Sequence, residues 1–232
     1  MRDQGDEREQ RERVLKAVFQ MEPETPPVIR TNYANLNFIV AGGMLEQATD
    51  TPWQELIRKQ LFDPLGMASA GFGPPASGAE TKQPWGHNAQ GTAIPPSAET
   101  ADNPPVLGPA GTVHCSLNDL ARYYSFHLRK GTSQKGQRLV AADAFDTLHG
   151  LDQDADEWGF GWIKAERPWA GGIALHHSGT NTMFYAIVWL APARDFGVVV
   201  VTNQGGDNAA KATDVVAGSL AQRYGNPQQH PN

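Results

Sequence analysis

A tyrosine and an asparagine two residues apart, Tyr33 and Asn35, could together move a proton and hold a substrate. A phenol can take up and return a proton, and a carboxamide both donates and accepts hydrogen bonds. The pair follows a proline-rich extended run and opens a segment of helical apolar periodicity, so both side chains should lie at a loop-to-helix corner beside a cleft. Because so short a motif is often fortuitous, a buried tyrosine next to a helix-entry asparagine is the alternative.

A second cluster, at residues 176–180, combines imidazole, hydroxyl and glycine. It ends an apolar segment that starts at Ile173 and predicts a strand. A strand that ends His177-Ser178-Gly179 offers in one row a basic or donor side chain, a hydroxyl and an exposed backbone amide. An acyl-transfer site needs these groups to hold a carbonyl and to stabilise its oxyanion.

Metal and thiol chemistry are weaker candidates. His176 and His177 are adjacent on the predicted strand, so their side chains point to opposite faces and do not easily share a metal ion. His87, His114 and Cys115 show no ligand spacing, and we expect neither a metal site nor a cofactor. Cys115 precedes a helix cap, where a thiol can be acidic, but a lone cysteine is more often a small buried residue. A single cysteine forms no internal disulfide.

The composition excludes several classes of partner. The chain has 232 residues, of which 40% are hydrophobic and 19% charged, with a net charge of −6. An acidic chain of this kind is not expected to bind nucleic acid or an anionic membrane surface. It contains no run of eighteen apolar residues, so we expect no membrane span. Residues 1–13 are almost wholly polar, the opposite of a secretory signal, and leave the compartment undetermined.

Residues 1–150 are predicted to be a helical region. Thr51 and Gln54 suit a capping box, and Ser116 suits a helix N-cap. Residues 69–109 are rich in Gly, Pro, Ala and Ser and predict a long irregular loop that lines a cleft. Residues 1–13 predict a solvated charged segment, and apolar periodicity predicts helices over about 14–19, 36–47, 53–61, 117–128 and 141–148.

Residues 151–224 are predicted to form an antiparallel sheet and a closing helix. Alternation predicts strands near 158–162, 173–177, 184–190 and 197–202, followed by a helix over 207–224 and a disordered tail at 225–232. The valine run 198–201 is apolar on both faces and favours a central strand. Helices followed by an antiparallel sheet make this an α+β chain.

Six motifs occur in an order that resembles one known superfamily. They are Tyr33-Ala34-Asn35, the apolar helix after it, residues 62–67 (Phe-Asp-Pro-Leu-Gly-Met), Pro109-Ala110-Gly111, residues 159–162 (Gly-Phe-Gly-Trp), and His177-Ser178-Gly179. The order resembles that of the serine β-lactamases and penicillin-binding proteins, in their class C-like branch of esterases, D-amino-acid peptidases and β-lactamase-related hydrolases. The resemblance covers about residues 12–221.

The resemblance implies roles for particular residues. Tyr33 would take a proton from a serine nucleophile and return one to the leaving group, and Asn35 would hydrogen-bond the catalytic lysine and the substrate amide. His177-Ser178-Gly179 would stand in the place of the family's Lys-Thr-Gly strand. The backbone amide of Thr180 would form half of the oxyanion hole. Residues Trp85 and His87 would lie on the loop over the cleft and contact substrate.

One departure from the family pattern bears on activity. The family nucleophile is the serine of a Ser-x-x-Lys motif, and none of the eight serines here is followed by lysine three residues later. We therefore expect an N-terminally truncated version of the β-lactamase/transpeptidase-like fold, one incomplete domain that is inactive alone. In the family the valine strand pairs with N-terminal strands, so here it would become an apolar edge prone to self-association or to pairing with the missing segment.

The expected substrates are small-molecule esters, amides or β-lactams. Because His is mostly neutral at pH 7, His177 in place of Lys favours an esterase or peptidase over a true β-lactamase. A non-catalytic binding module, or a remnant of a penicillin-binding-protein-like protein, is the alternative. Family members are often periplasmic or secreted.

Overall fold

The computed structural model describes residues 5–24, 32–77, 82–151 and 158–225. The helices are α1 Glu7–Val18, α2 Asn35–Thr49, α3 Trp53–Ile57, α4 Asp63–Leu65, α5 Gly108–Gly111, α6 Leu117–Leu128, α7 Ala142–Leu148 and α8 Asp207–Tyr224, with a π-helical turn at Arg58–Phe62 and 3-10 turns at Pro105–Leu107, Pro168–Ala170 and Pro192–Arg194. The strands are β1 Gly71–Phe72, β2 Gly86–His87, β3 Ala93–Ile94, β4 Val113–His114, β5 Ile163–Arg167, β6 Gly172–Thr180, β7 Tyr185–Ala191 and β8 Phe196–Thr202.

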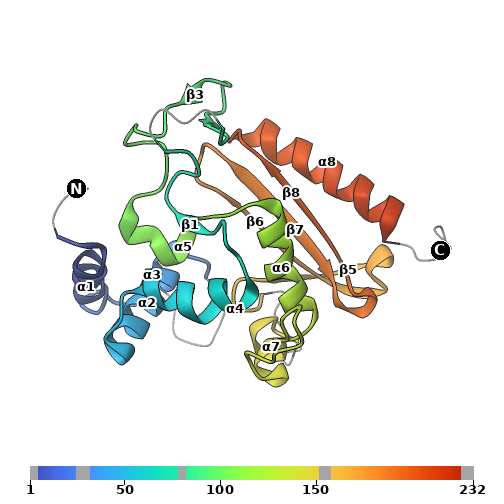
Figure 1. The fold of residues 1–232 in the computed structure, drawn as a ribbon, viewed down its shortest axis with the longest axis horizontal. Helices are drawn as coiled ribbons and strands as arrows, with labels where there is room; N and C mark the ends of the chain where they lie inside the picture. Colours follow the sequence, from blue (N-terminus) through green and yellow to red (C-terminus); the bar gives the residue numbers. More distant parts are fainter. Residues whose placement is uncertain (1–4, 25–31, 78–81, 152–157, 226–232) are drawn as a thin grey trace.

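A four-stranded antiparallel sheet of order β5-β6-β7-β8 forms the centre of the molecule, which confirms the predicted α+β class (Figure 1). Leu175, Val188 and Leu190 pack with Tyr124 and Leu128 of α6 on one face. Ile187 of β7 and Val198 of β8 point to the other face of the sheet, where they pack on Ala217 and Ala221 of α8. The period-2 alternation of β7 therefore separates two layers of helix around the sheet.

Helix α8 covers the sheet with small residues. Its buried positions are Ala209, Thr213, Ala217 and Ala221, spaced by four, so they form one stripe. Small side chains let the helix backbone approach the sheet closely, and the larger Val215 stays 68% exposed. The predicted closing helix is confirmed with its bounds at 207–224. The predicted disordered tail lies outside the described residues from 226 onwards.

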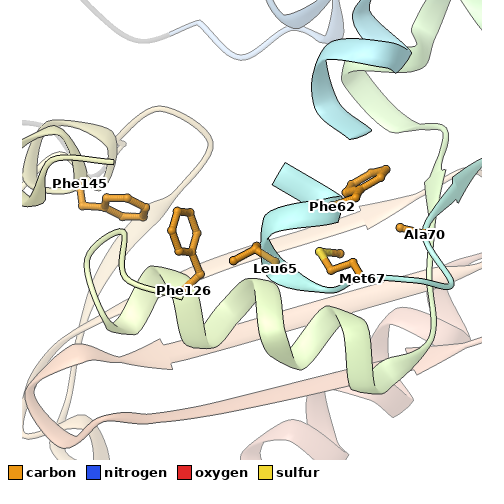
Figure 2. Close-up of a cluster of buried hydrophobic side chains, with 6 residues drawn as sticks. All are labelled: Phe62, Leu65, Met67, Ala70, Phe126 and Phe145. Carbon is orange, nitrogen blue, oxygen red and sulfur yellow. The ribbon is translucent and has the colours of Figure 1, made fainter. Parts of the chain in front are cut away.

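A second core fills the space between the helices. Phe62, Leu65 and Met67 around α4 pack against Phe126 of α6 and Phe145 of α7 (Figure 2). The rings of Phe126 and Phe145 meet edge to face at 5.2 Å, a favourable aromatic arrangement. This cluster holds α6 in place, and α6 in turn supplies residues to the cavity described below.

The prediction of a solvated charged segment at residues 1–13 is wrong for the described part, because α1 begins at Glu7 and buries Arg11. Arg11 is fully buried and donates to Glu46 of α2 at 2.9 and 2.6 Å, and to Gln54 of α3 at 2.9 Å. Glu46 also accepts the backbone N–H of Trp53 at 2.7 Å. The predicted capping box at Thr51 is therefore wrong, because a carboxylate from the preceding helix occupies the cap position. The Ser116 cap on α6 is confirmed.

The segment predicted as a strand at 158–162 is a turn instead. Only Trp158 makes an isolated bridge, and the paired strand begins at Ile163. Gly159 packs directly on the backbone of Leu148 and His149, so an added Cβ would lie 2.6–2.8 Å from their atoms and from Gly150. The large–small alternation thus reports close backbone packing, as predicted, but not a strand.

Strand β8 is an edge within the described residues, since it pairs only with β7. The prediction of a central strand is wrong for this chain, while the prediction of an apolar edge is confirmed, with Val201 42% exposed. Among the helices of the described ranges, none is long and apolar enough to cross a membrane.

Candidate functional site

A cavity of about 260 Å³ lies between the start of α2, helices α5 and α6, and strands β6 and β7. Six of its thirteen described lining residues are Phe, Tyr or Trp: Tyr33, Phe38, Tyr123, Tyr124, Phe160 and Trp162. The other lining residues are Pro109, Ala110, His127, Leu148, Gly161, His177 and Val188. Segments from 33 to 188 along the chain meet here, so the cavity is a product of the tertiary structure.

Tyr33 stands just before α2, where Ala34 has extended backbone angles and acts as the N-cap residue. Its side chain is 48% exposed, and its hydroxyl donates to Asn35 Oδ1 at 3.2 Å. The ring lies 6.3 Å from His177, 5.8 Å from Trp158 and 6.2 Å from Phe38, measured between centroids. The structure therefore brings the first predicted cluster to the second, across a cavity that both line.

His177 faces the cavity from β6, in register with Val188 of β7. Burial lowers the pKa of its imidazole, and the Gly161 backbone opposes this only in part. The ring is therefore neutral at pH 7. Its Nδ1 atom is buried and has no hydrogen-bond partner among the described residues. The imidazole therefore presents an uncharged ring to the cavity, while its Nδ1 atom is shielded from it.

The remaining residues of the predicted His-Ser-Gly strand have different surroundings. Ser178 pairs with Ile187, whose side chain belongs to the α8 face, so strand alternation directs the hydroxyl away from His177. The Thr180 hydroxyl donates to the Phe184 carbonyl at 2.6 Å and accepts the Thr182 N–H at 2.9 Å, which shapes the β6–β7 turn. A Cβ added at Gly179 would meet nothing within 4 Å.

The backbone of β6 is open on one side beyond His176. The ladder to β5 ends at the pair Ile163–His176, whereas the ladder to β7 continues to the pair Thr180–Tyr185. Within the described ranges, no other strand pairs with this side of 177–180. Unpaired backbone N–H and C=O groups next to a cavity can bind an extended ligand as an added strand would.

Trp85 and His87 lie elsewhere and do not line the cavity. The His87 N–H is shared between the carbonyls of Met183 at 3.1 Å and Asn203 at 2.8 Å, and the Trp85 carbonyl accepts from Asn203 Nδ2 at 2.9 Å. This part of the long loop fastens the β6–β7 turn to the end of β8. The contacts position the distal end of β6 rather than a ligand in the cavity.

Sequence reasoning missed the floor of the cavity. His127 Nδ1 lies 3.0 Å from His149 Nε2, and both imidazoles are buried. Burial is the main cause that lowers the pKa of His127 to about 3 and that of His149 to about 4. Tyr123 and Tyr124 line the same wall. The signal was available, because Leu120, Tyr123, Tyr124 and His127 share one helical stripe.

Thiol and metal chemistry find little support. Burial, aided by the Asp119 carboxylate, raises the pKa of Cys115 to about 11, so the thiol is protonated at neutral pH. No group of three or more His, Cys, Asp or Glu side chains in the described part of the chain could hold a metal ion.

The fold is that of β-lactamases and penicillin-binding proteins. A β-lactamase/D-alanine carboxypeptidase from Pseudomonas syringae superposes with a TM-score of 0.70 at 18% identity, covering 92% of this chain and 65% of that one. The crystal structure of SurE gives a TM-score of 0.69 at 22% identity, covering 95% and 52%. A mutant class C β-lactamase gives 0.67 at 15% identity, covering 87% and 60%.

The chain belongs to the Beta-lactamase family, whose model matches residues 1–222. It is 24% identical to penicillin-binding protein 4 of Amycolatopsis lactamdurans over 205 residues, covering 83% of this chain and 52% of that protein. It is also 24% identical to the unguisins hydrolase ungD' of Aspergillus campestris over 197 residues, covering 82% and 36%. The chain thus spans about half or less of the length of these relatives.

Proposed function

We propose that this chain forms the tyrosine- and oxyanion-bearing part of a β-lactamase-related acyl-transfer site for a small-molecule ester, amide or β-lactam. The observation that carries the proposal is the approach of Tyr33 to His177 across the cavity, with ring centroids 6.3 Å apart. Membership of the Beta-lactamase family supports the reaction class. The open side of β6 beside the cavity gives an acyl substrate a backbone to pair with.

In this proposal each residue has the role that its match to the family motifs implies. Tyr33 takes the proton of an attacking serine and returns one to the leaving group, and Asn35 holds the Tyr33 hydroxyl and the substrate amide. His177 contacts the substrate as a neutral ring. The Thr180 N–H supplies half of an oxyanion hole, since its hydroxyl is already engaged in the turn.

The attacking alcohol is the part that this sequence does not supply, because it has no Ser-x-x-Lys motif. We therefore propose that the chain alone has no serine-hydrolase turnover. The second candidate is a non-catalytic binding module, and the same observation favours it, since the cavity is formed without a nucleophile. The two candidates differ in whether a Ser-x-x-Lys segment restores activity.

The edge strand β8 is the proposed place of assembly. Its unpaired backbone and the exposed Val201 would pair with an N-terminal segment or with a second copy of the chain. A penicillin-binding protein homologue from Pyrococcus abyssi, described as octameric, shares the fold with a TM-score of 0.62 at 20% identity. Light scattering should find the isolated chain dimeric or larger, and a sharp monomer would contradict the idea.

Reconstitution tests the function directly. The pure chain should not hydrolyse nitrocefin or p-nitrophenyl butyrate. Fusing an N-terminal segment that contains a Ser-x-x-Lys motif to the chain should give hydrolysis. Because general acid–base catalysis contributes about 10²–10⁴-fold, Tyr33→Phe should lower the restored kcat by at least about 100-fold. Full activity in the Tyr33→Phe fusion would refute the acyl-transfer role, and an inactive fusion that still binds substrate would favour the binding module.

A further inference from the structure

Among the residues that the structure describes, those lining the cavity include none with a permanent charge. None of its lining residues is Lys, Arg, Asp or Glu, although the chain as a whole has 19 Lys and Arg and 25 Asp and Glu. The two histidines in the wall, His127 and His177, are neutral at pH 7 because burial lowers their pKa. Burial also raises the pKa of Tyr123 to about 12, so its phenol stays protonated. The lining residues that the structure describes therefore offer no full charge to a ligand at neutral pH.

The size and lining of the cavity suit a ring. A cavity of about 150 Å³ lined by apolar side chains is enough to bind benzene, and this one has about 260 Å³. Six of its lining residues are aromatic, and offset or edge-on packing between rings adds to the gain from burial. The phenols of Tyr33 and Tyr123 in the lining offer hydrogen bonds that orient a neutral polar group on the ligand.

Desolvation then decides which ligands the wall accepts. A neutral amide or ester that enters exchanges water for the phenol groups. A carboxylate must give up much stronger hydration, and the described part of the wall has no Lys or Arg to compensate for it. An ammonium group would likewise find no carboxylate, only the faces of rings. The wall therefore favours neutral ligands over both kinds of ion.

We propose that this cavity binds a neutral aromatic group of the substrate and rejects substrates that place a carboxylate there. The proposal rests on the function proposed above only in assigning the group to an acyl-transfer substrate. The binding itself needs no nucleophile. For the chain without a Ser-x-x-Lys segment, it names neutral aryl esters and amides, rather than carboxylate-bearing β-lactams or peptides with a free C-terminus, as the class of ligand bound.

Three probes that share one ring and differ in charge test the selectivity on the chain as it exists. They are 4-fluorophenylacetamide, 4-fluorophenylacetate and 4-fluorophenethylamine, each titrated at pH 7 and followed by ¹⁹F NMR. The amide should bind at least about tenfold more tightly than either ion, a difference of about 1.4 kcal/mol. Equal or tighter binding of the carboxylate or the amine, or no binding of the amide, would overturn the proposal.

Substitutions at the rim show whether the cavity is the binding place. Phe160 lines the cavity and is 64% exposed, so replacing it should not unfold the chain. Phe160→Arg should tighten binding of the carboxylate about tenfold by giving it a cation. Phe160→Ala should weaken binding of the amide and should not tighten binding of the carboxylate. Val215→Arg on α8, across the sheet from the cavity, should leave all three affinities unchanged.

Two readouts separate this inference from the proposed function. Selective binding of the amide without turnover in the Ser-x-x-Lys fusion would leave the inference standing and remove the acyl-transfer role. If the fusion instead hydrolyses carboxylate-bearing substrates in preference to neutral aryl esters, the acyl-transfer role stands and the inference about neutral aromatic ligands is overturned.

Discussion

The buried ion pair between Arg11 and Glu46 is the contact whose loss should be felt most strongly. It joins α1 to α2, the helix that presents Tyr33 and Asn35 at its start. The exposed fractions of the two side chains are 0% and 2%. Replacing Glu46 by Leu leaves the guanidinium buried without its carboxylate and also removes the acceptor of the Trp53 N–H.

The expected cost follows from these contacts. Removing one partner of a buried, hydrogen-bonded ion pair costs about 3–5 kcal/mol, because an uncompensated charge remains. Against a total stability of about 5–15 kcal/mol for a domain, Glu46→Leu should bring the chain close to unfolding at room temperature. Arg11→Met should have a similar effect, whereas the double variant removes both charges and should be within about 2 kcal/mol of the parent.

Urea denaturation followed by circular dichroism measures all four proteins of this double-mutant cycle. The coupling free energy should be at least about 4 kcal/mol, because two single losses of about 3–5 kcal/mol each exceed a double loss of at most about 2 kcal/mol. Lys59→Ala, which removes an exposed ion pair with Glu55, is the matched control and should leave the midpoint unchanged. Additive effects of the two single variants would refute the reasoning.

Three further changes test other parts of the structure. The folded-state pKa values of His127 and His149 lie far below the unfolded value of about 6.5, so the unfolded chain binds more protons than the folded chain below pH 7. The free energy of unfolding should therefore fall from pH 7 to pH 5, by at most about 1.4 kcal/mol per pH unit for each histidine. Urea titrations that show no such slope, or the same slope in His127→Gln, would contradict this. Gly159→Ala should destabilise by about 1–3 kcal/mol, because its Cβ meets fixed backbone, whereas Gly218→Ala, with open space on α8, should stabilise slightly in the same melting experiment. Iodoacetamide should alkylate Cys115 slowly at pH 7 in the folded chain and readily in urea, since burial raises its pKa to about 11; rapid reaction of the folded chain would revive a thiol function.

Local patterns were sufficient for most of the elements. The Ser116 cap of α6 and the strand patterns of β6 and β7 depend on neighbours within a few positions. Such patterns can be recognised without knowing the tertiary structure, because each indicates which face of one helix or strand is buried. The order of these elements was enough to indicate the family.

Contacts between distant residues were not accessible in the same way. Arg11 has the sequence signature of a solvated charge, and only its meeting with Glu46, 35 positions away, makes it a buried one. The start of β5 at Ile163 depends on how closely Gly159 packs against the backbone of Leu148. The sequence of one chain alone does not show that Arg11 meets Glu46 or that Gly159 packs on the backbone of Leu148.

The sequence by itself determined most of the long helices and strands, the α+β class and the two polar clusters around Tyr33 and His177. Only the tertiary structure decided that these clusters meet across one cavity, that Trp85 and His87 fasten a turn outside it, and that His127 lies beneath it. The physical reason is that periodicity is fixed within one helix or strand. The charge and shape of a cavity depend instead on which faces of different elements pack together.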